Sequence, residues 1–314
     1  MTSWRPIFGL PKKKECASTL SFFGKFIAQT KSNVRAYLEY SHIGPLRRMT
    51  GDVELQEMTN ISRFSSAARA SAFHFSLSIL VALLTAILVF HIWYPWPLYE
   101  LVTGRELFRL VVGVDVVCGP LLTLVLWNPA KPRRELTMDL SLVAAVQIIA
   151  LAYGMYTVAI ARPVHLVFET DRLRVVTASE IEAADLPQAP PGLRDLPWTG
   201  PTLISLRAPR DSQELVESID LSAAGKEPSL RPGWWQSYDL GLPQLLQRAK
   251  PVAQLAQVRH VQKPLLEEAV HKSGVSAKDL LWLPLTSAKS MEWIVLLDKN
   301  TGIPRGYAPI DGFF

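Results

Sequence analysis

Apolar residues gather in three long runs in the middle of the chain, at 75–93, 107–127 and 140–161, and short polar segments separate them. Each run has about 20 residues, the length that an α-helix needs to cross the hydrocarbon layer of a bilayer. One such run would also fit a buried helix of a soluble domain, but three in succession favour membrane spans. The first run begins too far along the chain, and is too long, for a signal peptide.

Basic residues in the short loops indicate how these spans are oriented. Three lie in the loop at 128–139, whereas the loop at 94–106 contains only Arg105, and Arg63 and Arg69 precede the first run. Because short loops rich in Lys and Arg stay in the cytoplasm, we expect the N-terminus and the second loop there. An odd number of spans then places the C-terminal region on the far side of the membrane, which for a protein of a bacterial inner membrane is the periplasm.

Aromatic residues at the ends of the runs agree with this orientation. Trp93, Tyr94, Trp96 and Tyr99 follow the first run, and Trp127 ends the second. Amphipathic rings settle at the headgroup level of a bilayer. We therefore expect the first four at the outer interface and Trp127 at the inner one, with membrane lipids as partners of the helices.

Residues 162–314 have ordinary globular composition and are long enough to form a core of their own. Strand-like and helix-like segments alternate there, each bounded by turn residues. They are a strand pair at 163–176 around Thr170-Asp171, a strand at 202–209, a helix from Asp211 or Ser212 to Gly225, helical pieces over 243–273 broken at Pro251 and Pro264, and a terminal hairpin turning at 299–302. The predicted fold is a membrane protein with three transmembrane α-helices (domain 64–161), followed by a small α+β extracytoplasmic domain (162–314).

Residues 1–63 contain scattered Lys and Arg and little periodicity, so we expect a basic segment without regular structure. Met58 resembles a start position, and translation is expected to begin there, which would make residues 1–57 an annotation artefact. The alternative is a cytoplasmic arm that binds anionic lipid. The basic run Lys12-Lys13-Lys14 is too short to favour that alternative.

Composition and motifs point away from enzyme chemistry. The two cysteines, Cys16 and Cys118, lie too far apart to suggest a metal site, and they form no disulfide framework. A net charge of +5 does not require a nucleic-acid partner. The histidines lack metal-ligand spacing, His165 reads as a half-buried strand residue, and nucleophile and phosphate-binding motifs do not occur. We expect no enzyme activity, no metal and no cofactor.

Asp115 lies near the middle of the second apolar run. A central Asp costs about 2.5 to 3.5 kcal/mol on insertion scales, whereas each Leu, Ile, Phe or Val returns about 0.3 to 0.6 kcal/mol. The run contains thirteen such apolar residues, so it can insert with its carboxylate. An ionisable group at this depth normally faces the helix bundle and has a partner there.

Helical spacing places Asp115, Gly119 and Thr123 on one face of the span, as a small and polar stripe suited to close helix contact. Pro120 is expected to kink the helix and to free the carbonyl of Val116 as an acceptor for a protonated Asp115.

A rise of about 1.5 Å per residue puts Tyr153 of the third run and Thr85 of the first near the depth of Asp115. Gln147 lies lower, near Gly119, and about 120° around the third helix from Tyr153. We therefore expect Tyr153 or Thr85 to be the direct partner of the carboxylate.

Five strings occur in a characteristic order: "WYPWPLYE" at 93–100, "VGVDVVCGPLLTLVLWNPAK" at 112–131, "ALAYGMYTVAIARPVHLVFETDRLRVV" at 150–176, "LPWTGP" at 196–201 and "GYAPIDGF" at 306–313. Together they resemble the type IV pilin accessory protein family (TfpX/TfpZ type) over about 64–314. The resemblance implies a protein that assists pilus assembly by binding a type IV major pilin in the membrane and periplasm, without catalysis. A membrane sensor or transport subunit with a ligand-binding periplasmic domain is the alternative.

Three interpretations of the intramembrane carboxylate stay open at this point. It either locks the bundle as a neutral hydrogen-bonded group, or docks a pilin helix, or takes part in proton or ion transport. The resemblance suggests the second, because a type IV pilin has an apolar N-terminal helix with a free amino group. Transport is weakened by the lack of a second buried charge. The candidate residues for docking are Asp115, Gly119, Pro120, Thr123, Tyr153 and Thr85.

Two further features in the C-terminal region are candidate binding groups. Asp171, Arg172 and Arg174 form a charged trio just outside the third span, although a solvated or ion-paired surface is the simpler interpretation. Trp234 and Trp235 would form a recognition patch if exposed, whereas aromatic residues of a small domain are more often part of the core.

Overall fold

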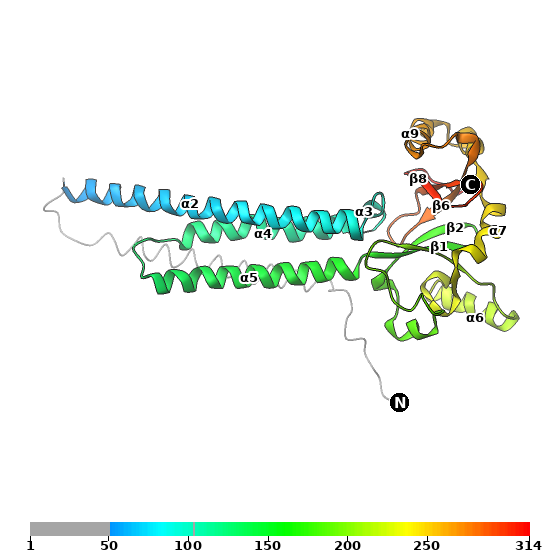
Figure 1. Cartoon of the computed structure of the whole chain (residues 1–314), viewed down its shortest axis with the longest axis horizontal. Coiled ribbons are helices and arrows are strands. Elements are labelled where there is room, and N and C mark those ends of the chain that lie inside the picture. Colours follow the sequence, from blue (N-terminus) through cyan, green and yellow to red (C-terminus); the bar gives the residue numbers. More distant parts are fainter. Residues whose placement is uncertain (1–50, 103) are drawn as a thin grey trace, which may run out of the picture. The chain divides into compact units, whose positions relative to one another are not determined.

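The computed structural model of the chain describes residues 51–102 and 104–314. Long helices come first along this stretch, and an α+β domain follows them (Figure 1). Residues 1–50 lie outside the described residues, so most of the expectation for the N-terminal segment stays a prediction.

The three apolar runs each lie in a long helix. Helix α2 (Gly51–Ile87) continues into the π-helix η2 (Leu88–Trp93), and α4 (Gly104–Leu126) and α5 (Arg133–Ile160) follow. Each of the three helical segments is long and apolar enough to cross a membrane. Many of their large apolar side chains are exposed, as they would be on helices that face lipid.

Helix α2 begins earlier than the charge pattern predicted, at Gly51. The residues that follow include Glu, Leu, Gln and Met, which are strong helix formers, and no proline occurs among them. Good local propensity therefore extends the helix beyond its apolar part.

The C-terminal domain is built on one eight-stranded sheet, with the strand order β4-β3-β1-β2-β6-β7-β8 and β5 paired to β6. The strands are β1 (Pro163–Glu169), β2 (Arg172–Thr177), β3 (Thr202–Leu206), β4 (Trp235–Ser237), β5 (Lys250–Pro251), β6 (Leu280–Thr286), β7 (Trp293–Asp298) and β8 (Pro304–Ala308). The predicted strand pair β1–β2 and the terminal hairpin β7–β8 are confirmed as antiparallel pairs. Strands β3 and β6 extend the β1–β2 pair by parallel pairing on its two sides.

The helix predicted from Asp211 or Ser212 and the helical region predicted over 243–273 are both present, but the region starts earlier, at Tyr238, and Pro264 lies in the first turn of its last helix instead of breaking it. The helices of this domain are α6 (Ser212–Ala223), α7 (Tyr238–Arg248), α8 (Val252–Val258) and α9 (Lys263–Ser273), joined by the short 3-10 turns η3 (Ala178–Glu180), η4 (Ala183–Gln188), η5 (Pro228–Leu230), η6 (Pro232–Trp234), η7 (His260–Gln262) and η8 (Ala277–Asp279). Asp211 is the N-cap of α6, and its side chain accepts a hydrogen bond of 2.8 Å from the Glu214 amide. Gly225, just beyond the helix, has a φ of 86°, which glycine adopts without strain.

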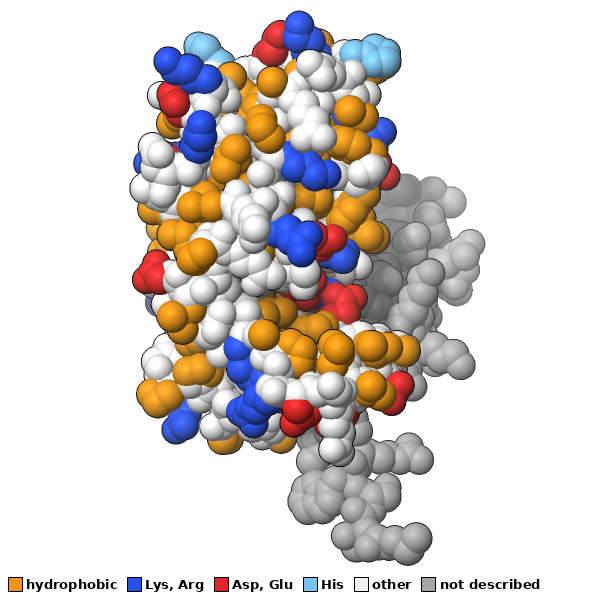
Figure 2. All heavy atoms as spheres, turned by 90° about the vertical axis from the view of Figure 1, so that its right-hand side faces the viewer, with side chains coloured by type: hydrophobic (Ala, Val, Ile, Leu, Met, Phe, Trp, Pro, Cys, Tyr) orange, Lys and Arg blue, Asp and Glu red, His pale blue; other side chains and the backbone are white. Residues whose placement is uncertain are grey.

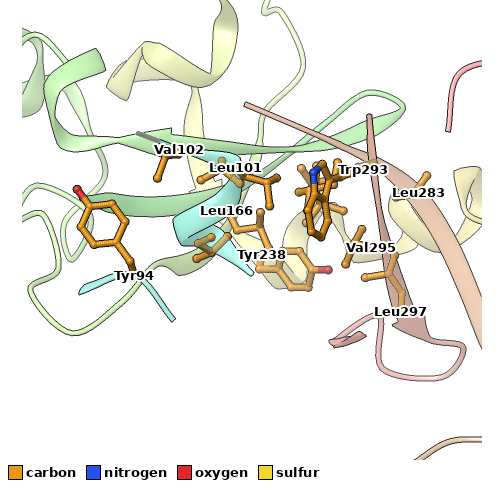
Figure 3. Packing of buried hydrophobic residues seen from close by; sticks show 14 of the residues in the cluster. Tyr94, Leu101, Val102, Leu166, Tyr238, Leu283, Trp293, Val295 and Leu297 are labelled. Atoms are coloured by element: carbon orange, nitrogen blue, oxygen red, sulfur yellow. The ribbon is translucent and has the colours of Figure 1, made fainter. Parts of the chain in front are cut away.

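The segment between the first two long helices completes the core of the C-terminal domain. The short helix α3 (Leu98–Leu101) and its neighbours pack with side chains of the sheet in one hydrophobic cluster (Figure 3). The hydroxyl of Ser287 donates a hydrogen bond of 2.6 Å to the Leu101 carbonyl. Tyr94 is fully buried and donates a hydrogen bond of 2.7 Å to the Val158 carbonyl. Tyr94 is therefore a core residue, and the expectation that its ring faces the membrane interface is wrong.

His165 on β1 is fully buried rather than half-buried. Its Nδ1 atom lies 2.7 Å from the Thr202 hydroxyl, and its ring packs edge-on against Trp235. Its Nε2 atom has no hydrogen-bond partner among the residues that the structure describes. Burial lowers the pKa of His165 to about 4, so the imidazole is neutral in the folded protein.

This burial makes the stability of the folded protein depend on pH. The unfolded imidazole has a pKa of about 6.5, so between pH 6.5 and pH 4 only the unfolded chain takes up the proton. The free energy of unfolding should fall by about 2 kcal/mol from pH 7.5 to pH 5, measured by chemical denaturation. His165→Phe should lose this part of the pH dependence, whereas a change at the exposed His271 should keep it. Equal slopes for both variants would contradict the prediction.

Candidate functional site

Polar side chains join the long helices to one another. Between α2 and α4, the Ser71 hydroxyl donates a hydrogen bond of 2.8 Å to the Pro120 carbonyl. The Nδ1 atom of His74 lies 2.6 Å from the Thr123 hydroxyl, which is buried. Helix α4 runs through Pro120 without interruption. Thr123 of the predicted stripe and the carbonyl of Pro120 therefore contact α2.

Helices α4 and α5 approach each other closely at two glycines. A Cβ atom added at Gly119 would lie 2.1 Å from the Nε2 atom of Gln147, and one added at Gly154 would lie 2.4 Å from Val111. Gln147 donates a hydrogen bond of 3.1 Å to the main-chain carbonyl of Asp115. Small residues permit this close approach of two helices.

A cavity of about 200 Å³ lies among the three long helices. Side chains from α2, α4 and α5 all line it, and most of them are apolar. The polar members are His74, Ser78, Thr85, Asp115 and Gln147. The carboxylate thus faces the helix bundle, as an ionisable group inside a membrane would.

The expected hydrogen bond to the Asp115 carboxylate is not formed. The hydroxyl of Thr85 lines the cavity but donates to the Val81 and Ala82 carbonyls of its own helix. Tyr153 is 60% exposed and does not line the cavity. The prediction of Tyr153 or Thr85 as the direct partner is therefore wrong.

Gln147 bonds to the main-chain carbonyl of Asp115 instead. A carbonyl in a helix points toward the residue four positions later, which is Gly119 here, and the Gln147 side chain packs against that glycine. Within the described part of the chain, no side chain donates a hydrogen bond to the carboxylate, and Asp115 donates none to the Val116 carbonyl. The hydrogen bonds between the long helices are instead made by the side chains of Ser71, His74 and Gln147.

Ser71 and His74 do not appear among the sequence-based candidates, since both precede the first apolar run. A signal exists in their spacing, because positions 71, 74, 78 and 85 of α2 are polar and recur on one helical face. Extending the run upstream along the helix would have shown this polar stripe.

Two of the five candidates in the C-terminal domain are buried. Trp235 packs in the core, and its Nε1 atom donates a hydrogen bond of 2.9 Å to the Ser229 carbonyl. Arg174 is buried in ion pairs with Glu180, at 3.2 Å, and with Glu227. Both are structural, in agreement with the simpler interpretation of each group.

The structure brings the other three together. Asp171, Arg172 and Trp234 line one hollow of about 470 Å³ beside the ends of β1 and β3. Arg172 and Asp171 form an ion pair of 3.0 Å. Trp234 lies against the guanidinium groups of Arg207 and Arg231. This hollow is a candidate contact site, in addition to the cavity among the long helices.

These features define the class of the protein. It combines three helices of membrane-spanning length and composition, a cavity lined by a carboxylate that has no hydrogen-bond partner among the described residues, and an α+β domain whose core includes the segment between the first two helices. Among residues 51–102 and 104–314, no group of three His, Cys, Asp or Glu side chains could hold a metal ion. The class is therefore a protein with three helices of membrane-spanning length followed by an α+β domain.

Comparison with known proteins gives the family. Residues 62–103, which include most of the first long helix and α3, match the family model of the fimbrial assembly protein FimB. The chain is 39% identical over 255 residues to the fimbrial assembly protein of serogroup I from Dichelobacter nodosus, which covers 81% of this chain and 99% of that protein. The serogroup E1 protein gives the same values.

The protein of serogroups C1 and C2 from the same organism is 46% identical over 130 residues, which is 41% of this chain and 99% of that protein. The chain therefore belongs to the family of fimbrial assembly proteins, and the resemblance to type IV pilin accessory proteins is confirmed. No solved structure matches it.

Proposed function

We propose that this chain is an inner-membrane accessory protein of type IV pilus biogenesis that binds the apolar helix of a pilin subunit beside α2, α4 and α5. The observation that carries this proposal is the Asp115 carboxylate, which lines a cavity without a partner among the described residues. A half-buried carboxylate that lines a mostly apolar cavity favours an incoming cation. The family resemblance supplies one, the free amino group of a pilin helix.

The proposed topology has the N-terminus in the cytoplasm and the C-terminal domain in the periplasm. The three basic residues of the loop at 128–139 support it. The exposed apolar side chains of the long helices support contact with lipid. In this topology the α+β domain and the pilin's periplasmic part lie on the same side of the membrane.

The other interpretations of Asp115 are less well supported. A bundle lock does not need this carboxylate, because Ser71, His74 and Gln147 already join the helices. Ion transport normally uses a series of ionisable groups. In the described part of the chain, Asp115 and His74 are the two ionisable side chains that line the cavity.

Site-specific photocrosslinking in intact cells tests the proposal. Ile148 and Ile149 of α5 are 66% and 68% exposed, but only Ile148 lines the cavity. A photoreactive residue at 148 is expected to crosslink to pilin, and the same residue at 149 is the matched control. A deletion strain should lose surface pili and regain them when the wild-type gene is restored.

The role of the carboxylate is tested by adding Asp115→Asn to the variant that carries the photoreactive residue at position 148. Losing one charge-assisted hydrogen bond, about 1.5 to 3 kcal/mol, should lower the pilin adduct at least tenfold at an unchanged protein level. Asp139→Asn is the control, because Asp139 pairs with Lys131 at 2.6 Å and does not line the cavity. A collapse of the protein level would identify a bundle lock, and equal adducts from 148 and 149 would rule out the cavity as the docking site.

A further inference from the structure

Helix α6 has its apolar side turned outward. Leu215, Val216 and Ile219 lie on one side of the helix and are 48%, 58% and 61% exposed. The side chain that the helix buries is the small polar Ser218. A surface helix normally does the opposite and places its apolar stripe against the core.

Polar contacts hold α6 in this orientation. Arg207 forms two hydrogen bonds to the Glu214 carboxylate, of 2.6 and 2.9 Å. Arg231 donates to the Ser218 carbonyl and to the Ser222 hydroxyl, both at 2.9 Å. Hydrogen bonding to Arg207 lowers the pKa of Glu214 to about 2, so this attachment stays intact at physiological pH.

The apolar residues of α6 contribute nothing to the core of the domain. None of them belongs to the three hydrophobic clusters formed by the described residues. Contiguous apolar side chains that face solvent mark an interaction surface in a soluble domain. The helix is therefore attached through its polar side, and its apolar side faces away from the core.

The residues around Leu215, Val216 and Ile219, here called the apolar stripe of α6, indicate what kind of partner would bind there. Leu215 also lines the 470 Å³ hollow that contains Trp234, so the stripe continues into a concave site. Asp211, Glu217 and Asp220 are exposed on α6 or at its cap, and no Lys or Arg lies between 211 and 223. Figure 2 looks onto the side of the domain that carries α6 and shows a band of hydrophobic side chains with both acidic and basic side chains at its edges.

The topology of the sheet places α6 away from the long helices. Strand β1 leaves α5 at its N-terminal end, and β3 runs parallel to β1, so α6 follows β3 at the opposite end of the sheet (Figure 1). Seven residues of strand span about 23 Å. A bilayer around the long helices would not reach the stripe.

A second copy of this chain is also a poor occupant. A two-fold contact through α6 would bring the acidic residues of both copies together, and like charges disfavour such an interface. We infer that the outer face of α6 and the adjoining hollow dock a protein segment that presents apolar side chains flanked by Lys or Arg. This inference does not depend on the proposed pilin site among the long helices.

Binding of designed peptides to the full-length chain in phosphatidylcholine nanodiscs tests the inference. Two fluorescent amphipathic peptides carry the same leucines, flanked by Lys in one and by Glu in the other. The Lys peptide is expected to bind at least tenfold more tightly by fluorescence anisotropy. Replacing two of the exposed acidic residues of α6, in the double variant Glu217→Lys and Asp220→Lys, should invert this preference.

The apolar contribution is tested with the double variant Val216→Ser and Ile219→Ser. It should weaken binding of the Lys peptide at least tenfold at an unchanged midpoint of thermal unfolding, because neither side chain packs in the core. Val261→Ser removes another highly exposed apolar residue, 81% exposed, and should leave binding unchanged. The inference would be overturned if both peptides bound equally, or if the double variant still bound the Lys peptide. A lowered unfolding midpoint of the double variant, or a dimer of the wild-type chain that this variant dissociates, would also overturn it.

Discussion

Replacing Gly154 with leucine is expected to destabilise the packing of α4 against α5 by about 1 to 3 kcal/mol or more and to lower the amount of protein in the cell. A Cβ atom at this position would lie 2.4 and 2.7 Å from the two Cγ atoms of Val111 and 3.1 Å from its Cβ. A branched side chain is stiff at χ1, and its Cβ is fixed to the backbone, so Val111 cannot rotate away. The two helices would have to separate.

Gly113→Leu is the matched control for this variant. Gly113 also lies in a long apolar helix, but beyond its own turn of helix a Cβ atom there would meet no atom of the described residues within 4 Å. Leucine at 113 should leave stability unchanged or raise it by up to about 1 kcal/mol through better helix propensity. Unfolding of the purified proteins by detergent titration, with immunoblots of cell membranes, separates the two. A similar loss for both glycines would show that close packing is not the cause.

Replacing Arg174 with methionine is expected to cost about 3 to 5 kcal/mol of stability. Arg174 is buried and pairs with both Glu180 and Glu227. Glu180 also accepts hydrogen bonds from the amide and hydroxyl of Thr177, so its carboxylate is fixed in place when the guanidinium is removed. The uncompensated charge, rather than the lost packing, accounts for most of the expected loss.

Arg172→Met provides the comparison, because Arg172 lies two residues away on the same strand but is more exposed. Its ion pairs with Glu169 and Asp171 are partly solvated. Exposed pairs contribute about 0 to 1 kcal/mol, so this variant should unfold close to the wild type. Chemical denaturation followed by tryptophan fluorescence measures both. A small loss for Arg174→Met would mean that the acidic partners find solvent or another cation.

The sequence by itself determined the long helices and most elements of the C-terminal domain. Runs of about 20 apolar residues leave little alternative to a long helix, since they exceed the length of ordinary strands. Local signals also fixed smaller features. Asp211 caps α6, and turn residues separate the strands of the terminal hairpin. The family resemblance was likewise based on short sequence motifs such as "WYPWPLYE".

Strand β6 was not among the predicted elements, although it lies between β2 and β7. Its sequence, "LLWLPLT", is apolar almost throughout and contains Pro284, so it has no alternation to identify. A strand covered on both faces shows this kind of pattern. Its place became clear only from its pairing with two distant strands.

Only the tertiary structure decided which residues meet. Depth counting along ideal helices pointed to Tyr153, but the rotation of α5 about its axis turns Tyr153 outward and brings Gln147 to the Asp115 carbonyl. The outward face of α6 has the same kind of cause. Its apolar spacing alone predicts burial, but Arg207 and Arg231, which lie before and after the helix in the sequence, fold back onto its polar side and attach it there. Periodicity gives the faces of a helix, whereas the packing of other elements decides which face is covered.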